Sequence, residues 1–79
     1  MNEFADIGAG GFVAVSRIVA VVAPDSAPVK RAVAEAKEKG GAVDASGGKK
    51  TQSVIFTDSG IVLLSSYPPD KIAGGSVHE

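Results

Sequence analysis

The longest apolar stretch of the chain is FVAVSRIVAVVA, residues 12–23. It is rich in β-branched residues and predicts one long strand, with a bend at Ser16 and Arg17. Both faces of such a strand would be apolar, whereas an antiparallel sheet with one solvated face should alternate between apolar and polar residues. Two shorter runs, VIF at 54–56 and IVLL at 61–64, have the same two-sided character.

The other elements complete a small α+β pattern. Glycines at 8–11 predict a turn after the first strand, and Asp58-Ser59-Gly60 predicts another. The segment after Pro69 predicts a weak helical turn. The expected strands are residues 3–7, 12–23, 42–45, about 52–57 and 61–66.

One segment carries clear helix signals, PDSAPVKRAVAEAKEKGG at 24–41. Ser26 or Asp25 can cap its start, Pro28 suits its first turn, and the glycine pair at 40–41 ends it. The signals predict a helix of about 13 residues. We therefore expect a small antiparallel sheet with one main helix.

A single helix covers only one face of a two-sided sheet. The chain is 79 residues long and 44% hydrophobic, and domains of this size rarely gain more than about 3–5 kcal/mol from their own core. It has no cysteine and only His78 as a histidine, so neither disulfides nor a histidine-based metal site within one chain can add stability. We expect another copy to cover the second face, which predicts a homo-oligomer.

The length predicts a single domain, which we place at residues 1–73, with residues 74–79 as a flexible tail. The N-terminus is acidic where a signal peptide would be basic, and no run of about 20 apolar residues exists. We expect a cytoplasmic protein without a membrane partner.

Charge is unevenly distributed although the net charge is only −1. Between residues 30 and 51 six basic residues outnumber three acidic ones, giving +3, and the remainder carries −4. The asymmetry alone identifies no partner, and the net charge predicts neither nucleic-acid binding nor a membrane surface.

Two glycine stretches resemble nucleotide-binding motifs without matching them. In GAGG, Gly8 and Gly10 fit a dinucleotide fingerprint, but Val13 stands at its third glycine and a strand follows. In GGKKT, Lys49 stands where a P-loop requires glycine before its lysine, and again a strand follows. No acid, base or nucleophile arrangement is evident, so we expect neither an enzyme nor a cofactor.

Three basic residues remain as candidates for a binding site. Arg17 is a strand-end residue, or forms an ion pair with Asp44 or Asp58 across the sheet, or is a ligand contact at the sheet edge. Lys49 and Lys50 are either the solvated tip of a hairpin loop or a phosphate contact, since the adjacent glycines allow close approach of the backbone.

The chain resembles the RemA family of bacterial regulators, which activate extracellular (biofilm) matrix genes. The resemblance spans about residues 4–72 and rests on the IGAG turn, the SR before the apolar run, VAPDSAPVKR, VDA followed by GGKKT, and the TDS turn. It implies a curved antiparallel sheet with one main helix, similar to LytTR domains, assembled into closed rings that bind double-stranded DNA. The family's DNA contacts are an arginine at the position of Arg17 and two arginines that match Lys49 and Lys50.

Our main hypothesis is a ring-forming, DNA-binding transcriptional regulator that contacts DNA through Arg17, Lys49 and Lys50. The alternative is a diverged ring scaffold that binds another protein and not DNA. The lysines favour this alternative because they keep the charge of the arginines but lose the planar fork that grips phosphate.

Overall fold

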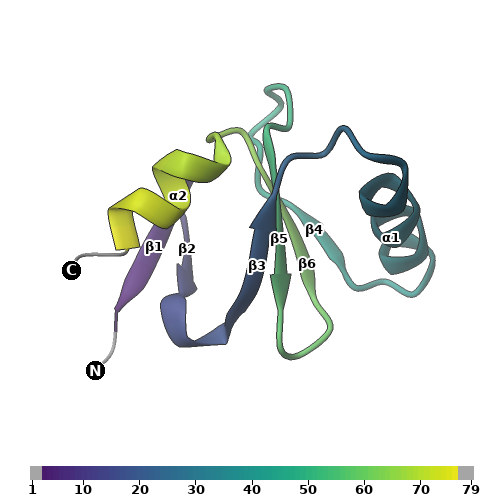
Figure 1. Ribbon diagram of the computed structural model, residues 1–79, viewed down its shortest axis with the longest axis horizontal. Helices are drawn as coiled ribbons and strands as arrows, with labels where there is room; N and C mark the ends of the chain where they lie inside the picture. Colours follow the sequence, from purple (N-terminus) through teal and green to yellow (C-terminus); the bar gives the residue numbers. More distant parts are fainter. Residues whose placement is uncertain (1–2, 77–79) are drawn as a thin grey trace.

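Four strands form the central sheet of the molecule (Figure 1). The computed structural model describes the backbone of residues 3–76 and the side chains of residues 3–72. The strands of the sheet, in spatial order, are β3 (Ile18–Val22), β5 (Ser53–Thr57), β6 (Val62–Ser65) and β4 (Ala42–Asp44). β3, β5 and β6 pair antiparallel, as expected, but β4 lies parallel to β6. Along the chain, β5 follows β4 and precedes β6, and it runs in the direction opposite to both. The sheet is therefore mixed and not purely antiparallel.

The expected strand at 12–23 is two strands in two sheets. The bend at Ser16 and Arg17 is confirmed, but it is a 3₁₀ turn, η1 (Val15–Arg17), that ends one sheet and starts the other. Before it, β1 (Phe4–Gly8) and β2 (Gly11–Ala14) pair as a separate antiparallel hairpin.

The main helix, α1 (Ala27–Glu38), forms where its sequence signals predict. The Ser26 hydroxyl accepts a hydrogen bond from the Val29 N–H at 3.4 Å, and Gly40 takes the left-handed conformation, φ 74°, that ends many helices. The helix covers one face of the sheet. On that face Val29, Val33 and Ala36 pack against Val54, Val62 and Leu64.

The second face of the sheet is covered by the same chain. Ile55 and Val21 contact the inner side of the β1–β2 hairpin, which presents Ala5, Ile7 and Val13. The expectation that another copy must cover this face is therefore wrong. Its reasoning failed because η1 folds the hairpin back over the sheet, so residues that seemed to extend the strand become its cover.

A second helix, α2 (Pro69–Ser76), completes this cover where only a weak helical turn was expected. Ile72 of α2 is 2% exposed and belongs to the same core cluster as the hairpin. The remainder of the expected tail, residues 77–79 with His78, lies outside the described residues. In the described part of the chain, neither helix has the length and apolar character needed to cross a membrane.

A buried hydrogen bond ties the two sheets together. The Ser65 hydroxyl of β6 donates to the backbone oxygen of Ile7 in β1 at 2.7 Å, and also accepts from the Tyr67 N–H. This bond satisfies a polar side chain that is fully buried. It also fixes where the hairpin sits on the sheet.

The cover supplied by α2 predicts the effect of Ile72→Ala. Truncating this buried side chain should lower the free energy of unfolding by about 2–5 kcal/mol, measured by chemical denaturation. Ile61→Ala is the matched control, because Ile61 lies in an exposed position after the β5–β6 turn, and it should cost about 1 kcal/mol or less. Equal losses for the two variants would contradict the placement of α2.

Candidate nucleic-acid interface

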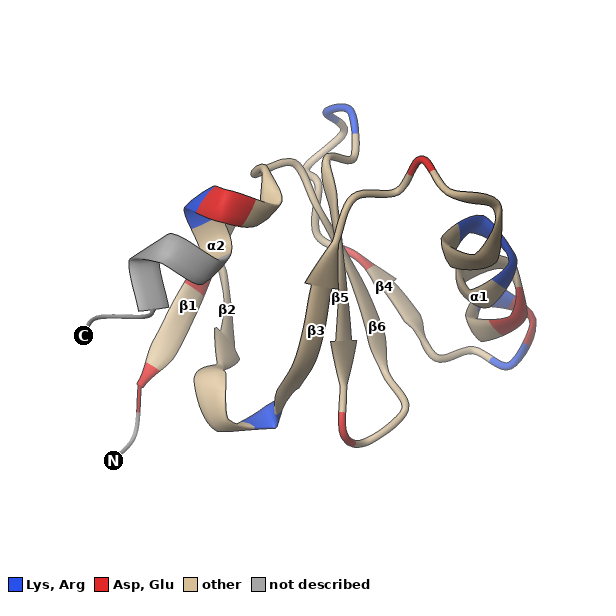
Figure 2. Cartoon of the chain, viewed as in Figure 1, with Lys and Arg blue, Asp and Glu red and all other residues tan. Residues whose placement is uncertain are grey.

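The lysine pair lies at the tip of the loop that joins β4 to β5, beyond one end of the sheet (Figure 2). Both side chains are exposed. Within the described residues the one ion pair joins Arg17 to Asp58, so neither lysine ammonium has a carboxylate partner. Two free cations on a projecting loop are accessible to an anion.

The loop has a defined shape. Gly47 and Gly48 both take left-handed conformations, with φ of 67° and 82°, which side chains other than glycine rarely adopt. The Lys49 N–H donates to the Ser46 backbone oxygen at 3.2 Å and closes a turn. At its start, the Asp44 carboxylate accepts from the Ser46 N–H at 2.9 Å and from the Ser46 hydroxyl at 2.6 Å.

These bonds also act on the charge of Asp44. The hydroxyl and the N–H of Ser46 both stabilise the carboxylate, so they lower the pKa of Asp44 from its ordinary value of 3.8. The carboxylate that anchors the loop is therefore ionised at neutral pH.

A second contact holds the loop against the hairpin turn. A Cβ atom on Gly47 would lie 3.1 Å from the Cβ of Ala9, so glycine lets the two loops approach closely. Ala9 itself has a φ of 54°. The turn of the hairpin that covers the sheet thus lies against the base of the lysine loop.

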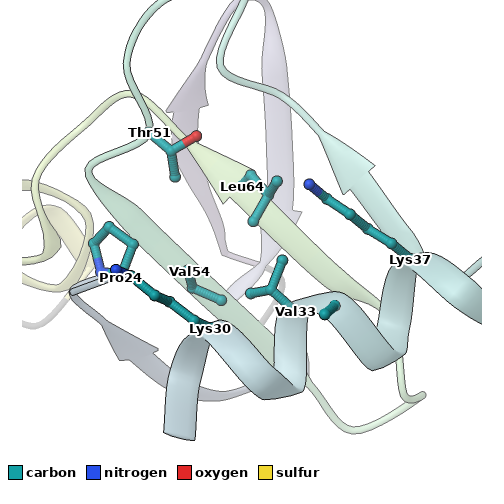
Figure 3. A pocket seen from close by; sticks show the side chains of 8 residues that line it. Pro24, Lys30, Val33, Lys37, Thr51, Val54 and Leu64 are labelled. Carbon is teal, nitrogen blue, oxygen red and sulfur yellow. The ribbon is translucent and has the colours of Figure 1, made fainter. Parts of the chain in front are cut away.

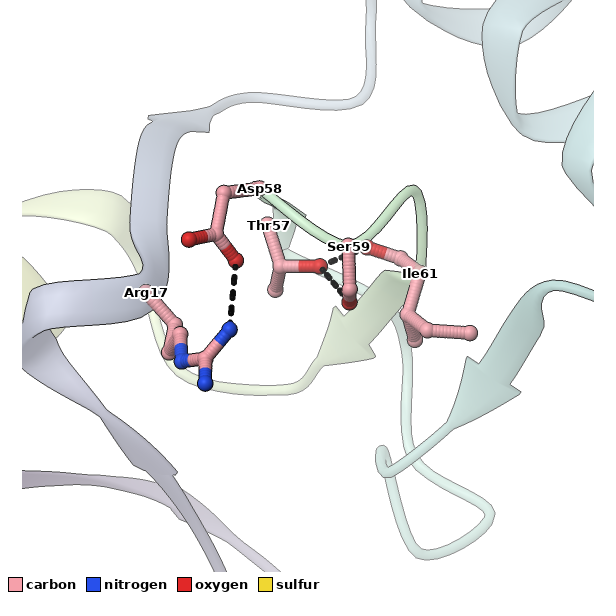
Figure 4. A network of polar contacts seen from close by, with 5 residues as sticks. All are labelled: Arg17, Thr57, Asp58, Ser59 and Ile61. Carbon is pink, nitrogen blue, oxygen red and sulfur yellow. Dashed lines mark hydrogen bonds and ion pairs between the residues drawn. The ribbon is translucent and has the colours of Figure 1, made fainter.

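Arg17 lies at the opposite end of the sheet, in η1 (Figure 2). Of the alternatives open from the sequence, the ion pair with Asp58 is present. The Arg17 guanidinium donates to the Asp58 carboxylate at 3.4 Å, with the two side chains 64% and 49% exposed (Figure 4). An ion pair this exposed contributes little stability, so a stronger anion could replace Asp58.

The turn that carries Asp58 is itself well ordered. The Asp58 N–H donates to the Arg17 backbone oxygen at 3.0 Å, and the Thr57 hydroxyl donates to the Ile61 backbone oxygen at 2.7 Å. These bonds hold the backbone that carries Asp58 beside Arg17, whose charge Asp58 partly neutralises.

One subunit does not bring its candidate residues together. Arg17 and the lysine pair lie beyond opposite ends of β5, and β5 alone spans about 13 Å, at roughly 3.3 Å for each of four steps. A phosphate bound by the lysines is thus out of reach of the same subunit's Arg17. The sequence could name these residues but not their separation. The sequence also contains the Asp-x-Ser spacing of residues 44–46, which is typical of a side-chain-capped turn and could have predicted the start of this loop.

The anchoring role of Asp44 predicts that Asp44→Ala loosens the loop. Amide hydrogen exchange at Lys49 should become faster, because the turn loses both bonds from Ser46. In the unsubstituted protein, the part of the protection at Lys49 that depends on the Asp44 carboxylate should be fully present at neutral pH. It should be lost only as the pH drops below 3.8 and through the lowered pKa of Asp44.

Asp25→Ala is the control for this variant, because Asp25 is an exposed aspartate that accepts no hydrogen bond from the described residues. Unchanged exchange in the Asp44 variant would show that the glycines alone shape the loop.

Known proteins resemble the chain over nearly its whole length. A family model described as "Extracellular matrix regulatory protein A-like" matches residues 4–74. A "Putative regulatory protein" of Geobacillus thermodenitrificans is 49% identical over 73 residues, which cover 92% of this chain and 84% of the relative. A relative from Synechococcus elongatus is 51% identical over 67 residues, which cover 85% of this chain and 77% of that protein. The chain therefore belongs to the RemA-like family of regulatory proteins.

Proposed function

We propose that this protein regulates transcription by binding DNA as a homo-oligomeric ring, and that it does so without catalysis. The observation that carries the proposal is the fixed, projecting loop with two unpaired lysines, in a chain whose family is described as regulatory. We infer from the family's description that genes for extracellular matrix are among its targets, and that it works in the cytoplasm, where the DNA is.

The chemistry of the loop suits phosphate. Each lysine is a compact cation with three donors, and the flanking glycines leave room for a phosphate chain to come close to the backbone. Binding of this kind gains free energy by releasing counterions from DNA and depends little on base sequence. One loop gives weak affinity, but several loops on one assembly raise it steeply because later contacts become intramolecular.

The surface of the chain supports assembly although its core is covered. Phe4 and Phe12 lie on the outer face of the β1–β2 hairpin, 63% and 64% exposed. Val43 is 49% exposed on β4, the edge strand on the opposite side of the sheet (Figure 1). The two exposed phenylalanines on one side and the exposed valine on the other could meet in head-to-tail contacts, which close into a ring when the rotation between copies allows it.

Assembly also resolves the separation of the candidate residues. The lysines and Arg17 lie at opposite ends of one subunit, so a continuous basic path requires contributions from neighbouring copies. DNA following the ring would meet the lysine loops at regular intervals. Arg17 would join once a phosphate replaced Asp58.

The ion pair between Arg17 and Asp58 favours a second candidate function, a ring scaffold that binds protein and not DNA. Asp58 neutralises Arg17, and the net charge of the chain is −1. A mobility-shift experiment with a promoter fragment at several salt concentrations separates the two candidates. A DNA-binding ring shifts the fragment at low salt and loses affinity steeply as salt increases, whereas a protein-binding scaffold leaves the DNA unshifted.

Replacing both loop lysines, Lys49→Ala with Lys50→Ala, should lower DNA affinity at least tenfold and leave the oligomer intact. The dependence of affinity on salt should also become less steep, by about one unit of log–log slope for each phosphate that a lysine no longer neutralises. The control is Arg31→Ala with Lys39→Ala, which removes the same charge from exposed positions on α1 and at its C-cap. Equal losses in the two variants would reject the loop as the site.

Releasing Arg17 from its partner should strengthen DNA binding. Asp58→Asn keeps the size of the side chain but removes the charge that competes with phosphate, so the affinity should rise a few-fold in the same mobility-shift measurement. Adding Arg17→Ala should abolish this gain. Asp70→Asn makes the same change in total charge at an exposed position on α2 and is the control. An equal gain from Asp70→Asn would assign the effect to total charge and not to Arg17.

If copies assemble through the hairpin, the double variant Phe4→Ser with Phe12→Ser should no longer form the oligomer. Analytical ultracentrifugation should show the oligomer replaced by monomers that keep their far-ultraviolet circular dichroism, because neither phenylalanine belongs to the buried core. Ile61→Ser, which changes an exposed residue directly after the β5–β6 turn and outside the hairpin, is the control. An unchanged oligomer in the double variant would exclude this interface.

A further inference from the structure

A groove runs between α1 and the face of the sheet that the helix covers (Figure 3). Its volume is about 360 Å³. Val33, Val54 and Leu64 form an apolar floor, and Lys30, Lys37 and Thr51 line its rim. Its lining includes Thr51 of the β4–β5 loop but neither of the loop lysines and not Arg17.

The sequence of α1 explains why the helix leaves this space. Lys30, Ala34 and Lys37 follow one another at spacings of four and three, so they lie along one side of the helix. This side borders the apolar face that packs on the sheet. Ala34 is too small to fill the gap between the lysines, and none of the twelve residues of α1 is buried. A bulky residue at position 34 would close the groove.

The rim is cationic and the lining holds no carboxylate. Lys30 and Lys37 are about 10.5 Å apart along the helix, at roughly 1.5 Å per residue. Neither ammonium has an ion-pair partner within the described residues, although the Asp44 carboxylate is close enough to Lys37 to have its pKa lowered by it. Asp44 is already bound to Ser46, so the groove offers apolar contact together with unused positive charge.

We propose that this groove binds a small amphiphilic anion, an aliphatic chain that ends in a carboxylate. The chain would lie on Val33, Val54 and Leu64, and the carboxylate would pair with Lys30 or Lys37, whose apolar stems extend the floor. The volume is at the lower end of the range of about 300–1,000 Å³ that is typical of small-molecule pockets.

The position of the groove gives the ligand a regulatory role, and this step rests on the proposed function. Thr51 directly follows Lys50, and both line a smaller hollow that shares Pro24 and Thr51 with the groove. A carboxylate held beside Thr51 places negative charge near the lysine loop, where it repels phosphate. The ligand therefore weakens DNA binding, and DNA weakens ligand binding by the same factor.

Direct binding is tested with decanoate, below its micelle concentration, on the full chain in its native assembly. Isothermal titration should show saturable binding, and amide chemical shifts should move most at Val33, Val54, Leu64 and Thr51. Decanol, which has the same chain without the charge, should bind at least tenfold more weakly. These measurements need no DNA, so they stand even if the proposed function fails.

Three variants locate the site. Ala34→Phe should abolish binding by filling the groove, and Lys30→Ala with Lys37→Ala should weaken it at least tenfold. Arg31→Ala with Lys39→Ala removes equal charge from α1 and its C-cap, outside the groove, and should leave decanoate affinity unchanged. Absence of saturable binding to the native assembly, or equal affinity in the Ala34→Phe variant, would overturn the proposal.

The regulatory step has its own test. Saturating decanoate should lower the affinity for DNA several-fold in the unsubstituted protein and leave that of the Ala34→Phe variant unchanged. Decanoate that binds in the groove without changing DNA affinity would overturn the regulatory step and leave the ligand site standing.

Discussion

The four-stranded sheet is apolar on both faces, and the rest of the structure follows from the need to cover both within one short chain. Val54 and Ile55 are adjacent in β5, point to opposite faces and are both fully buried. The main helix covers the first and the hairpin with α2 covers the second. Because these elements occupy the faces, the loops at the ends of the sheet remain free to carry charge.

This arrangement sets the geometry of the candidate interface. The hairpin is fixed by the bond from Ser65 to Ile7, and its turn supports the base of the lysine loop through Ala9 and Gly47. The cations therefore project from a rigid base instead of a mobile segment. Their distance from Arg17 follows from the length of β5, so one subunit offers two small, separate basic sites. The proposed DNA-binding surface would therefore need several copies.

Much of the local structure could be predicted from the sequence. Ser26, Pro28 and Gly40 mark the helix because capping and termination depend on near neighbours. The break at η1 could be predicted only as a bend, because the hairpin's apolar residues match the two-sided pattern of the strand that follows. Whether Ala5, Ile7 and Val13 extend a sheet or cover it depends on contacts with Ile55 and Ile72, far away in the chain. The Arg17 pair with Asp58 was one of two pairings that the residues allowed, and the distance that selects it is likewise set by tertiary structure.

The central claim is that a single subunit covers its own sheet, so that assembly joins folded units. It is tested most directly by a dilution series in which analytical ultracentrifugation and circular dichroism are measured on the same samples. The account predicts that the species that sediments as a monomer keeps its secondary structure and unfolds cooperatively in denaturant. Loss of structure that coincides with dissociation at every concentration would contradict it, because folding would then require a second copy.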